Sequence, residues 1–519
     1  MPETEHILIQ TSVERTDSIR AKLAELAWTE GISSFVTNGV PFSFSSGRVL
    51  AQGIAHIVDA LARTGDIRVM ELGAGIGYLS AFCLDTLKEN FPDTYERSTF
   101  LVSDGEEALV RDAEGQGVLV RHGHRAEFTV AGLQDKDTIL RSRPRILILS
   151  YLLDAIPPKH VEQRNGELKS ARIETSIPAD LSLLDGSEWP PRTLNADEVA
   201  TRLWAPLSTM TPALARKIVP LLGETWSWVS EGELTTAGTI LNSRQDVIRD
   251  LCSVLEEMPG ESALIITDFG YVESDEIELN EMMTEYGLCA FWAVAFDEIR
   301  EAADARGFET LLHRGEEGQT HTLVLYKGSR EEEMADAFRH GFNGMMSDRP
   351  GLVLQTLEED ASLRDIQRAI AKMEQTMPEV DVHSYGNLSR FARVLLQYGD
   401  LEGAARLAEK CVALYPEVAA PEMSILGAAK GKAGDLDAAA VLFQKAIDVA
   451  PGHANGYLGL SGVYRAREDW DRYFSCMRTY LSMAECDVVK VVAGIATTLA
   501  GTNLAGIAAE AAGWVEANC

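Results

Sequence analysis

An acidic residue followed by three closely spaced glycines is the strongest chemical signal in the sequence. Glu71 lies near the end of an apolar segment, residues 67–72, and Gly73, Gly75 and Gly77 follow before a helical pattern begins. Glycine lets a backbone turn sharply and approach a ligand closely. A carboxylate at the end of a strand can bind an ammonium group. The pattern predicts a strand–loop–helix site for a ligand that carries an amine.

The spacing of these glycines separates two candidate cofactors. A dinucleotide-binding loop has the pattern G-x-G-x-x-G and places a pyrophosphate at the helix N-terminus. Here the third glycine, Gly77, stands one residue early, and Glu71 would repel a pyrophosphate. S-adenosylmethionine (SAM) has an ammonium group and no pyrophosphate, so we predict SAM as the cofactor. Taken alone, the loop is also compatible with a structural strand–helix turn.

A second acid strengthens the SAM prediction. Asp104 ends the next predicted strand, where a carboxylate would meet the ribose hydroxyls of a nucleoside, and Ser150 ends the fourth strand. The carboxyl ends of neighbouring parallel strands meet at one edge of a sheet. The residues that we assign to the cofactor site are Glu71, Gly73, Gly75, Gly77, Asp104 and Ser150.

The residues after the fourth strand are candidates for the acceptor side of the site. In this architecture that strand ends beside the transferred methyl group, so Asp154 would orient a nucleophilic nitrogen or take its proton, with Tyr151 beside it. A turn or helix-capping aspartate is the alternative for Asp154. Asp268 follows the fifth strand and points to the same edge. His122 and His124 share a predicted strand face, but no Cys or acid stands at ligand spacing, so we expect no metal.

The elements that must hold these residues alternate between β-branched runs and helical periods, which predicts a parallel α/β sheet. Strands are expected at 67–72, 99–103, 127–130, 146–150 and 263–267, helices at 15–30, 47–64 and 78–90, and an antiparallel closing pair at 308–312 and 321–326. The predicted fold class is a Rossmann-like class I methyltransferase, a parallel sheet with an antiparallel closing strand. This domain spans residues 1–328, with N-terminal helices and a helical insertion at about 157–259 that forms a lid or only packs.

After a helical linker, residues 329–380, the sequence repeats itself. The triplet Gly-Asp-Leu at 399–401 recurs 35 residues later at 434–436, and loosely as Glu-Asp-Trp at 468–470. This period is close to the ~34 residues of a tetratricopeptide (TPR) repeat. The small, aromatic, small and proline positions of that motif are held by Ala439, Phe443, Ala446 and Pro451. We predict an all-α TPR solenoid over residues 381–519 that binds a protein or peptide, or serves as a dimerisation surface.

The composition narrows the classes of partner. The chain of 519 residues has 79 acidic and 47 basic side chains and a formal charge of −32, which repels phosphate backbones and anionic lipids. The seven cysteines are scattered without a CxxC pair, and no apolar stretch reaches about 18 residues. We expect a cytoplasmic protein that binds neither nucleic acid nor membrane.

Several motifs together resemble those of the MidA-like methyltransferases. They are the E-x-G-x-G-x-G loop, a D-A-x-P segment at 154–157, a D-aromatic-G segment at 268–270, and the segment at 44–51 ahead of the first strand. The resemblance covers about residues 40–327. The family includes mitochondrial complex I assembly factors that methylate arginine in a partner protein, so the resemblance implies SAM and a protein acceptor. The family usually has Asn-Glu where Ser150-Tyr151 stand here.

The predicted activity is methyl transfer from SAM to a nitrogen of a protein side chain, with arginine suggested by the resemblance and the TPR region recruiting the substrate. The enzyme would act mainly by positioning and desolvating the two reactants. Two alternatives stay open. One is a non-catalytic SAM-binding assembly factor or scaffold, which the loss of Asn-Glu favours. The other is a small-molecule methyltransferase whose TPR region only forms a homodimer.

Overall fold

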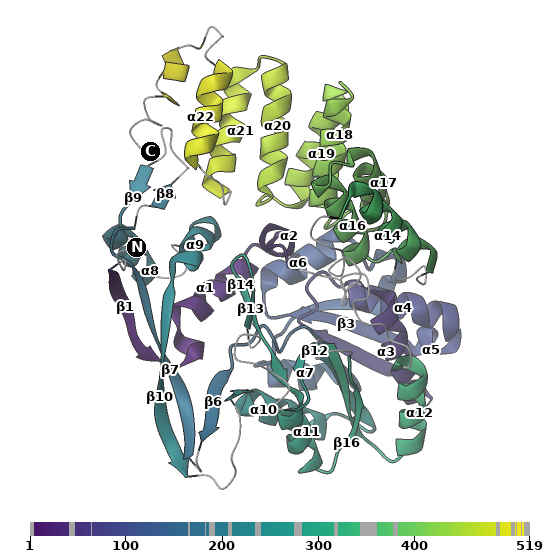
Figure 1. The fold of residues 1–519 in the computed structure, drawn as a ribbon. Helices are drawn as coiled ribbons and strands as arrows, with labels where there is room; N and C mark the ends of the chain where they lie inside the picture. Colours follow the sequence, from purple (N-terminus) through teal and green to yellow (C-terminus); the bar gives the residue numbers. More distant parts are fainter. Residues whose placement is uncertain are drawn as a thin grey trace.

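Eight of the described strands form a mixed sheet at the centre of the α/β part (Figure 1). Its order is β16-β17-β12-β5-β2-β3-β4, with the short β15 beside β12. The strands are β2 (Ile67–Leu72), β3 (Ser98–Asp104), β4 (Ala126–Val130), β5 (Ile146–Ser150), β12 (Ser262–Tyr271), β15 (Val294–Ala295), β16 (Glu309–His313) and β17 (Thr320–Lys327). β2, β3, β4, β5 and β12 are parallel, whereas β17 runs antiparallel to β12 and β16. The predicted parallel strands and the antiparallel closing pair are confirmed.

The computed structural model describes residues 5–40, 47–63, 65–164, 167–181, 183–185, 192–205, 210–233, 240–273, 283–315, 320–342, 361–376, 382–483, 488–499, 504, 506–509 and 511–512. Residues 44–46 of the segment at 44–51 lie outside the described residues, as do residues 343–360 and 377–380 of the predicted linker.

Helices cover both faces of the sheet, and each strand sends alternate side chains into two cores. Val69 of β2 packs with α3 (Arg48–Ala62) and α4 (Tyr78–Asn90), whereas Met70 packs with α10 (Gln245–Glu257) and α11 (Phe296–Asp304). Strand side chains alternate between faces, and a strand covered on both faces is therefore a continuous apolar run. The predicted helices at 47–64 and 78–90 are confirmed as α3 and α4.

Smaller elements complete the α/β part. They are α1 (Ile19–Trp28), which the sequence predicted at 15–30, and α2 (Ser33–Asn38), α5 (Pro92–Arg97), α6 (Glu107–Gln116), α7 (Lys136–Ser142), β13 (Met283–Tyr286) and β14 (Cys289–Trp292). The last two form a hairpin.

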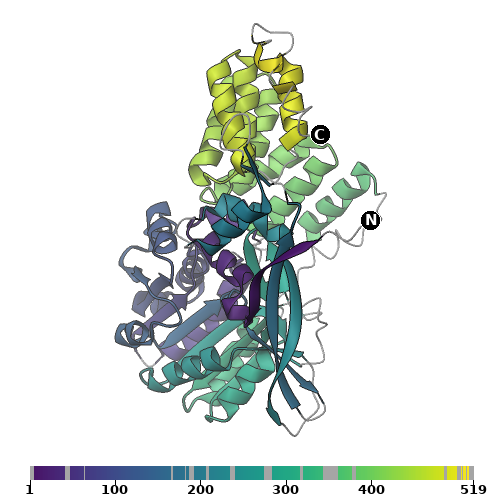
Figure 2. The ribbon, with the colours of Figure 1, turned by 90° about the vertical axis from the view of Figure 1, so that its left-hand side faces the viewer.

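The insertion after β5 is mainly a sheet, so the prediction of a helical insertion is wrong. An antiparallel sheet joins β1 (His6–Val13), β6 (Lys159–Arg164), β7 (Glu167–Pro178), β10 (Gly223–Glu233) and β11 (Ile240–Ser243), and stands beside the central sheet (Figures 1 and 2). Ala171, Ile173, Thr175 and Ile177 of β7 are buried in alternation with less buried neighbours. This period of two is the pattern of a strand.

The insertion also contains α10, and its remaining α-helices and strands are short. They are the hairpin β8 (Leu183–Asp185) and β9 (Arg192–Leu194) and the helices α8 (Ala196–Trp204) and α9 (Pro212–Ile218). The strand β1 was not predicted. It lies at the N-terminal end of the described chain and pairs with β7.

α12 (Glu331–Phe342) lies in the segment predicted as a helical linker, but it packs on the α/β part. The Phe342 ring is buried against α3, so close that a Cβ on Gly53 would lie 2.6 Å from it. Just before the helix, Arg330 forms an ion pair with Glu261, at 2.7 Å from Nε. The α/β part therefore extends through residue 342.

All regular elements of the described chain after α12 are helices. α14 (Leu363–Thr376) is followed by the pairs α16 (Tyr385–Gln397) and α17 (Leu401–Leu414), α18 (Ala420–Lys432) and α19 (Leu436–Val449), α20 (Ala454–Ala466) and α21 (Trp470–Met483), and then by α22 (Val488–Leu499). The first helices of the pairs begin at residues 385, 420 and 454, and the second helices at 401, 436 and 470. The repeat seen in the sequence is a repeat of helix pairs.

A left-handed residue followed by an aspartate explains the repeated triplet. Gly399 and Gly434 have φ of 85° and 84°, a conformation that favours glycine at the end of a helix. The aspartates that follow, Asp400 and Asp435, each cap the next helix through the side chain. In the third pair Glu468 takes the left-handed conformation, with φ of 57°.

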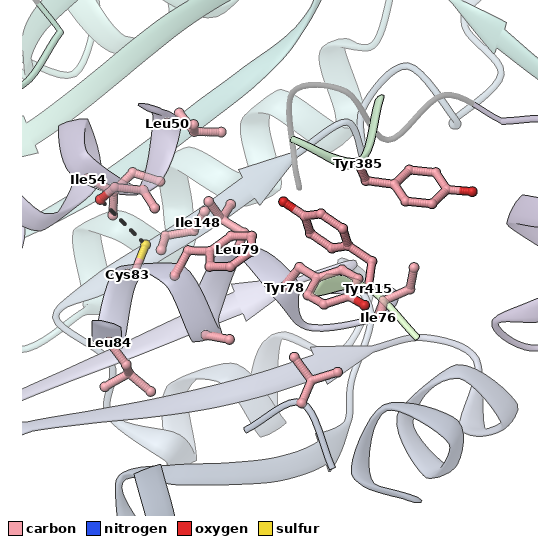
Figure 3. Close-up of a cluster of buried hydrophobic side chains, with 14 of the residues drawn as sticks. Leu50, Ile54, Ile76, Tyr78, Leu79, Cys83, Leu84, Ile148, Tyr385 and Tyr415 are labelled. Atoms are coloured by element: carbon pink, nitrogen blue, oxygen red, sulfur yellow. Dashed lines mark hydrogen bonds between the residues drawn. The ribbon is translucent and has the colours of Figure 1, made fainter. Parts of the chain in front are cut away.

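Aromatic side chains join the helical part to the α/β part (Figure 3). The ring of Tyr415 lies 5.6 Å from that of Tyr78 at the start of α4, and 5.8 Å from that of Tyr385 at the start of α16. The Tyr78 hydroxyl donates a hydrogen bond to the Glu417 carboxylate at 2.6 Å. The three tyrosines belong to the same buried core as Val69 of the sheet. The helical part is thus seated on the helix that follows the glycine loop.

Candidate active site

The glycine loop connects β2 to α4 at the carboxyl edge of the sheet. Gly73, Gly75 and Gly77 have φ of 68°, 53° and 81°, where other residues are strained. Gly75 is also crowded, because a Cβ there would lie 2.9 Å from the Phe35 ring of α2. The Asp104 carboxylate accepts a hydrogen bond from the Gly75 N–H at 3.2 Å and so holds the loop to β3. The backbone of this turn requires the three glycines.

Glu71 is buried beside this loop. One of its carboxylate oxygens accepts hydrogen bonds from the N–H and the hydroxyl of Ser80 in α4. Burial raises the pKa of Glu71 to about 7, although the bonds from Ser80 act in the opposite direction. A carboxyl group with this pKa is half ionised near neutral pH, and a nearby ammonium group would favour its charged form.

Asp104 and Ser150 end β3 and β5, the two strands that flank β2, and line the same cavity as Glu71. The second Asp104 oxygen accepts from the Glu106 N–H at 3.0 Å. Ser150 is buried, and its hydroxyl has no hydrogen-bond partner among the described residues. The residues predicted to hold the cofactor therefore come together at one place, and the role of each toward SAM stays a prediction.

Tyr151 follows β5 in a strained conformation. Its φ is 51°, which is uncommon for a bulky residue and occurs where a site over-determines the backbone. Its hydroxyl lies 2.9 Å from the Thr320 hydroxyl at the start of β17, in hydrogen-bond contact. Tyr151 lines the cavity, as predicted, but its hydroxyl is engaged with the neighbouring strand.

Asp154 lies in the turn after β5, and Asp268 of β12 holds that turn in place. The Asp268 carboxylate accepts hydrogen bonds from the backbone N–H groups of Leu153 at 2.9 Å and of Asp154 at 3.2 Å. A third bond comes from its neighbour Phe269, at 2.8 Å. The predicted position of Asp268 at this edge is confirmed, and its contacts position Asp154.

Burial raises the pKa of both carboxyl groups. The pKa of Asp268 rises to about 6, and that of Asp154 rises well above its ordinary value because the charge of Asp268 adds to the effect of burial. The three N–H groups favour the ionised form of Asp268, so Asp154 is the member of the pair that holds its proton more tightly. Its Oδ1 atom has no hydrogen-bond partner among the described residues.

A cavity of about 1310 Å³ lies over this edge of the sheet. The glycine loop, Glu71, Asp104 and Asp154 line its floor, whereas α2 and the β13–β14 hairpin line its walls. The start of α16 and the turn between α19 and α20 form its roof. This volume exceeds the roughly 300–1,000 Å³ of a typical ligand pocket. The cavity has room for a cofactor and a second reactant.

Several residues of the cavity were not predicted from the sequence. Phe35 comes from α2, Tyr286 from β13, Arg390 and Arg393 from α16, and His453 from the turn before α20. They lie far from the motifs along the chain. Arg390 and Arg393 share a face of their helix because they are three residues apart, but this spacing does not tell what that face meets.

The α/β part matches a known protein family. Residues 49–290 match the family model described as "Putative S-adenosyl-L-methionine-dependent methyltransferase", and this segment contains all of the predicted cofactor residues as well as Tyr151 and Asp154. The protein is therefore a SAM-dependent methyltransferase, and SAM is its cofactor. The match supports the resemblance to MidA-like methyltransferases. No curated protein sequence matches the chain.

Solved structures show only low similarity to the whole chain. An uncharacterized ACR protein from Burkholderia thailandensis is 16% identical, with a TM-score of 0.36, and the alignment covers 62% of this chain and 94% of that one. A protein of the same superfamily and organism, bound to S-adenosyl-homocysteine, is 14% identical, with a TM-score of 0.33 and coverage of 64% and 89%. MamA is 21% identical, with a TM-score of 0.25 and coverage of 28% and 85%. At these TM-scores the similarities carry no argument about this chain.

No group of three or more His, Cys, Asp or Glu side chains in the described part of the chain is placed to hold a metal ion. The sequence suggested that His122 and His124 share a strand face, and this prediction is wrong. They lie on either side of Gly123, whose φ of 58° interrupts the 3-10 helical segment Val120–Arg125. Within the described residues, no helix has the length and apolar character needed to cross a membrane.

Proposed function

We propose that the protein transfers the methyl group of SAM to a nitrogen of a protein side chain, and that the C-terminal helices act as TPR repeats that bring this substrate to the cavity. One observation carries the proposal. The helices supply the roof of the same cavity whose floor holds the predicted cofactor residues. A substrate nitrogen placed at Asp154 therefore lies under α16 and the α19–α20 turn.

The packing of the helix pairs supports the TPR interpretation. Phe443 of α19 packs against Gly427 of α18 and Gly459 of α20. A Cβ added at Gly427 would lie 2.9 Å from the Phe443 ring, and one added at Gly459 would lie 2.1 Å from it. Ala439 and Ala446 on the same helix are fully buried. Small residues around one large ring let consecutive helices stack closely, and stacked pairs present an extended surface for a partner.

In this mechanism SAM supplies an activated methyl group, and the chain positions the acceptor. The raised pKa of Asp154 favours its protonated form, in which the proton is shared with the Asp268 carboxyl group. Its Oδ1 atom, which has no partner among the described residues, can accept a hydrogen bond from the acceptor nitrogen and orient it. Of the two roles predicted for Asp154, orienting the nitrogen suits a protonated carboxyl group, whereas taking a proton from the nitrogen does not. Glu71 and Asp104 would hold the amine and the ribose, and the roof over the cavity would keep water from the reacting atoms.

A second candidate is a small-molecule acceptor, which the charge of the roof favours. Arg390 and Arg393 face the cavity from α16, and none of the described lining residues of the helical part is acidic. The guanidinium group of Arg393 would repel the arginine acceptor that the family resemblance suggests.

The test is incubation of the full chain with methyl-labelled SAM and an extract of its source cells, followed by separation of proteins from small molecules. Label in a protein, lost in Glu71→Gln, would support the first proposal. Label only among small molecules would support the second. Absence of label, although S-adenosylhomocysteine binds, would contradict both. We place this activity in the cytoplasm, which suits the free thiols of the described cysteines.

A further inference from the structure

A buried arginine behind the cavity ties the turn that carries Asp154 to the β13–β14 hairpin. Arg244 immediately precedes α10, and its side chain is buried. Its Nε atom donates a hydrogen bond to the Ile156 carbonyl in that turn, at 3.0 Å. Its two terminal nitrogens donate to the carbonyls of Trp292 at 2.9 Å and of Ala293 at 3.2 Å. Every nitrogen of the guanidinium group is thus bonded to a backbone carbonyl.

The same turn is held by two further contacts. The Trp292 N–H donates a hydrogen bond to the Asp154 carbonyl at 2.7 Å. The Asp268 carboxylate accepts from the N–H groups of Leu153 and Asp154. Trp292 therefore binds the turn directly through its N–H and indirectly, through Arg244, by its carbonyl. Asp154 is fixed from β12, from β14 and from the start of α10.

The charge of Arg244 is balanced by Asp154 and Asp268 without a direct ion pair. Within the described residues, Arg244 makes no ion pair at contact distance, because its nitrogens bond to carbonyls. Burial lowers the pKa of Arg244, and the charges of Asp268 and Asp154 act to raise it. Burial raises the pKa of both carboxyl groups, and Arg244 acts to lower it. Arginine stays protonated in proteins. The pair shares one proton, so its single negative charge offsets the positive charge of Arg244.

A second proton on the pair would bind at the Oδ1 atom of Asp154. Both oxygens of Asp268 already accept backbone N–H groups, one from Leu153 and Asp154 and the other from Phe269. The Oδ1 atom of Asp154 has no partner among the described residues. A proton there would turn this atom from a hydrogen-bond acceptor into a donor. The positive charge of Arg244 opposes that protonation.

Other titratable side chains near the pair or Arg244 are neutral or acidic. They are His321 of β17, Tyr271 of β12, Tyr286 of β13, His160 of β6 and Glu298 of α11. The Nδ1 atom of His321 accepts a hydrogen bond from the Gly315 N–H, so this ring is neutral. Burial lowers the pKa of His160 to about 3. Arg390 acts on the Tyr286 hydroxyl, whereas Arg244 acts directly on both carboxyl groups.

We propose that Arg244 is a positioning residue for methyl transfer. Its hydrogen bonds hold Asp154 against the hairpin, and its charge keeps the Oδ1 atom of Asp154 unprotonated, so that this atom accepts a hydrogen bond from the acceptor nitrogen. This inference rests on the proposed function, because that function places the nitrogen at Asp154. Arg244 is not among the described lining residues of the cavity and acts through Asp154.

The test measures the pH profile of methyl transfer by the full chain, with methyl-labelled SAM and an extract of its source cells. SAM is kept saturating, so that the ionisation of Glu71 does not limit the rate. The wild-type rate should fall on the acid side as a second proton binds to Asp154. Arg244→Gln removes the opposing charge, so the acid limb should move to higher pH by at least about one pH unit. Arg244→Lys keeps the charge and should hold the limb within about half a pH unit.

A double variant assigns this displacement to Asp154. The amide oxygen of Asp154→Asn accepts a hydrogen bond at every pH, so the displacement caused by Arg244→Gln should vanish in the Asp154→Asn background. Arg249→Gln is the matched control, because Arg249 is an exposed arginine of α10 near Asp246 and is not among the lining residues. It should leave the profile unchanged.

A purely structural role would lower the rate at every pH and leave the limb in place. An unmoved limb in Arg244→Gln, or an equal displacement in the Asp154→Asn background, therefore overturns the proposal. If Arg244→Gln does not fold, Arg244→Lys decides, because complete loss of transfer with normal binding of S-adenosylhomocysteine refutes the role of the charge. A wild-type acid limb that persists unchanged in Asp154→Asn overturns the proposal without any change at Arg244.

Binding of S-adenosylhomocysteine and the appearance of label separate the two possible failures. If the wild type does not bind S-adenosylhomocysteine, or binds it and labels no molecule of the extract, the proposed function is wrong and this inference is wrong with it. If the wild type transfers label and its acid limb does not depend on Arg244, only the role of Arg244 is wrong.

Discussion

Replacing Glu71 by glutamine separates two effects of one buried carboxyl group. Burial raises the pKa of Glu71 from 4.5 to about 7. Glutamine keeps the shape of the side chain, and its carbonyl oxygen can accept the bonds that Ser80 donates to Glu71. It cannot carry a negative charge. We therefore expect Glu71→Gln to stabilise the free protein and to weaken binding of the cofactor.

The effect on stability depends on pH with a definite sign. Because the pKa of Glu71 in the folded protein lies above 4.5, its contribution to stability is complete below that pH and is lost as the pH rises through about 7. The difference between the two pKa values corresponds to roughly 3 kcal/mol when Glu71 is fully ionised. The free energy of unfolding of Glu71→Gln, relative to that of the wild type, should therefore rise by up to roughly 3 kcal/mol between low pH and about pH 8.

Urea unfolding at about pH 5 and about pH 8 measures the first effect, and calorimetric titration with S-adenosylhomocysteine measures the second. Loss of the pair with the ammonium group should weaken binding at least about tenfold. Wild-type binding should itself weaken as the pH falls through about 7, because Glu71 must be ionised. A stability difference that is the same at both pH values would refute the raised pKa. Equal affinity of the variant would show that the ammonium group does not bind at Glu71.

Substitutions at three further residues test the acceptor side, the loop and the contact that seats the helical part. Because the raised pKa of Asp154 favours its protonated form, Asp154→Asn keeps both a hydrogen-bond donor and an acceptor and should lower methyl transfer less than about tenfold. Asp154→Ala should lower it by about 10² or more and spare S-adenosylhomocysteine binding. Gly75→Ala places a Cβ against Phe35 at a left-handed φ and should cost about 1–3 kcal/mol in urea unfolding, a loss that Phe35→Ala in the same chain should partly reverse. Tyr78→Phe removes the bond to Glu417 and should cost about 1–2 kcal/mol, with no change expected if that bond does not form in solution.

The sheet and the glycine loop were predictable because their signals are local. β2, α4 and β5 begin and end at the predicted residues. A strand buried on both faces is a continuous apolar run, and a left-handed turn requires glycine, so both can be read from neighbouring residues. The same reason holds for Gly399 and Gly434, whose left-handed turns set the period of the helix pairs.

The insertion and the roof of the cavity depend on residues that are far apart along the chain. β7 pairs with β1, which precedes every strand of the central sheet in the sequence. The length and register of β7 therefore depend on β1, and the residues of β7 do not indicate that partner. Arg390 and Asp154 face one cavity only because the helical part is seated on α4. A helix with two arginines on one face is compatible with exposure to solvent as well as with a binding site. The distinction requires the tertiary structure.

The contact that seats the helical part also ties it to the cofactor loop. Tyr78 comes directly after Gly77, and its hydroxyl bonds to Glu417 between α17 and α18. A shift of α4 when SAM fills the loop would therefore displace the helices that carry Arg390, and a substrate held by those helices would act on the loop in return. Such coupling is reciprocal in binding free energy, so any factor by which SAM strengthens acceptor binding must equal the factor by which the acceptor strengthens SAM binding. The proposed recruitment by the helices and cofactor binding by the loop would then be parts of one equilibrium.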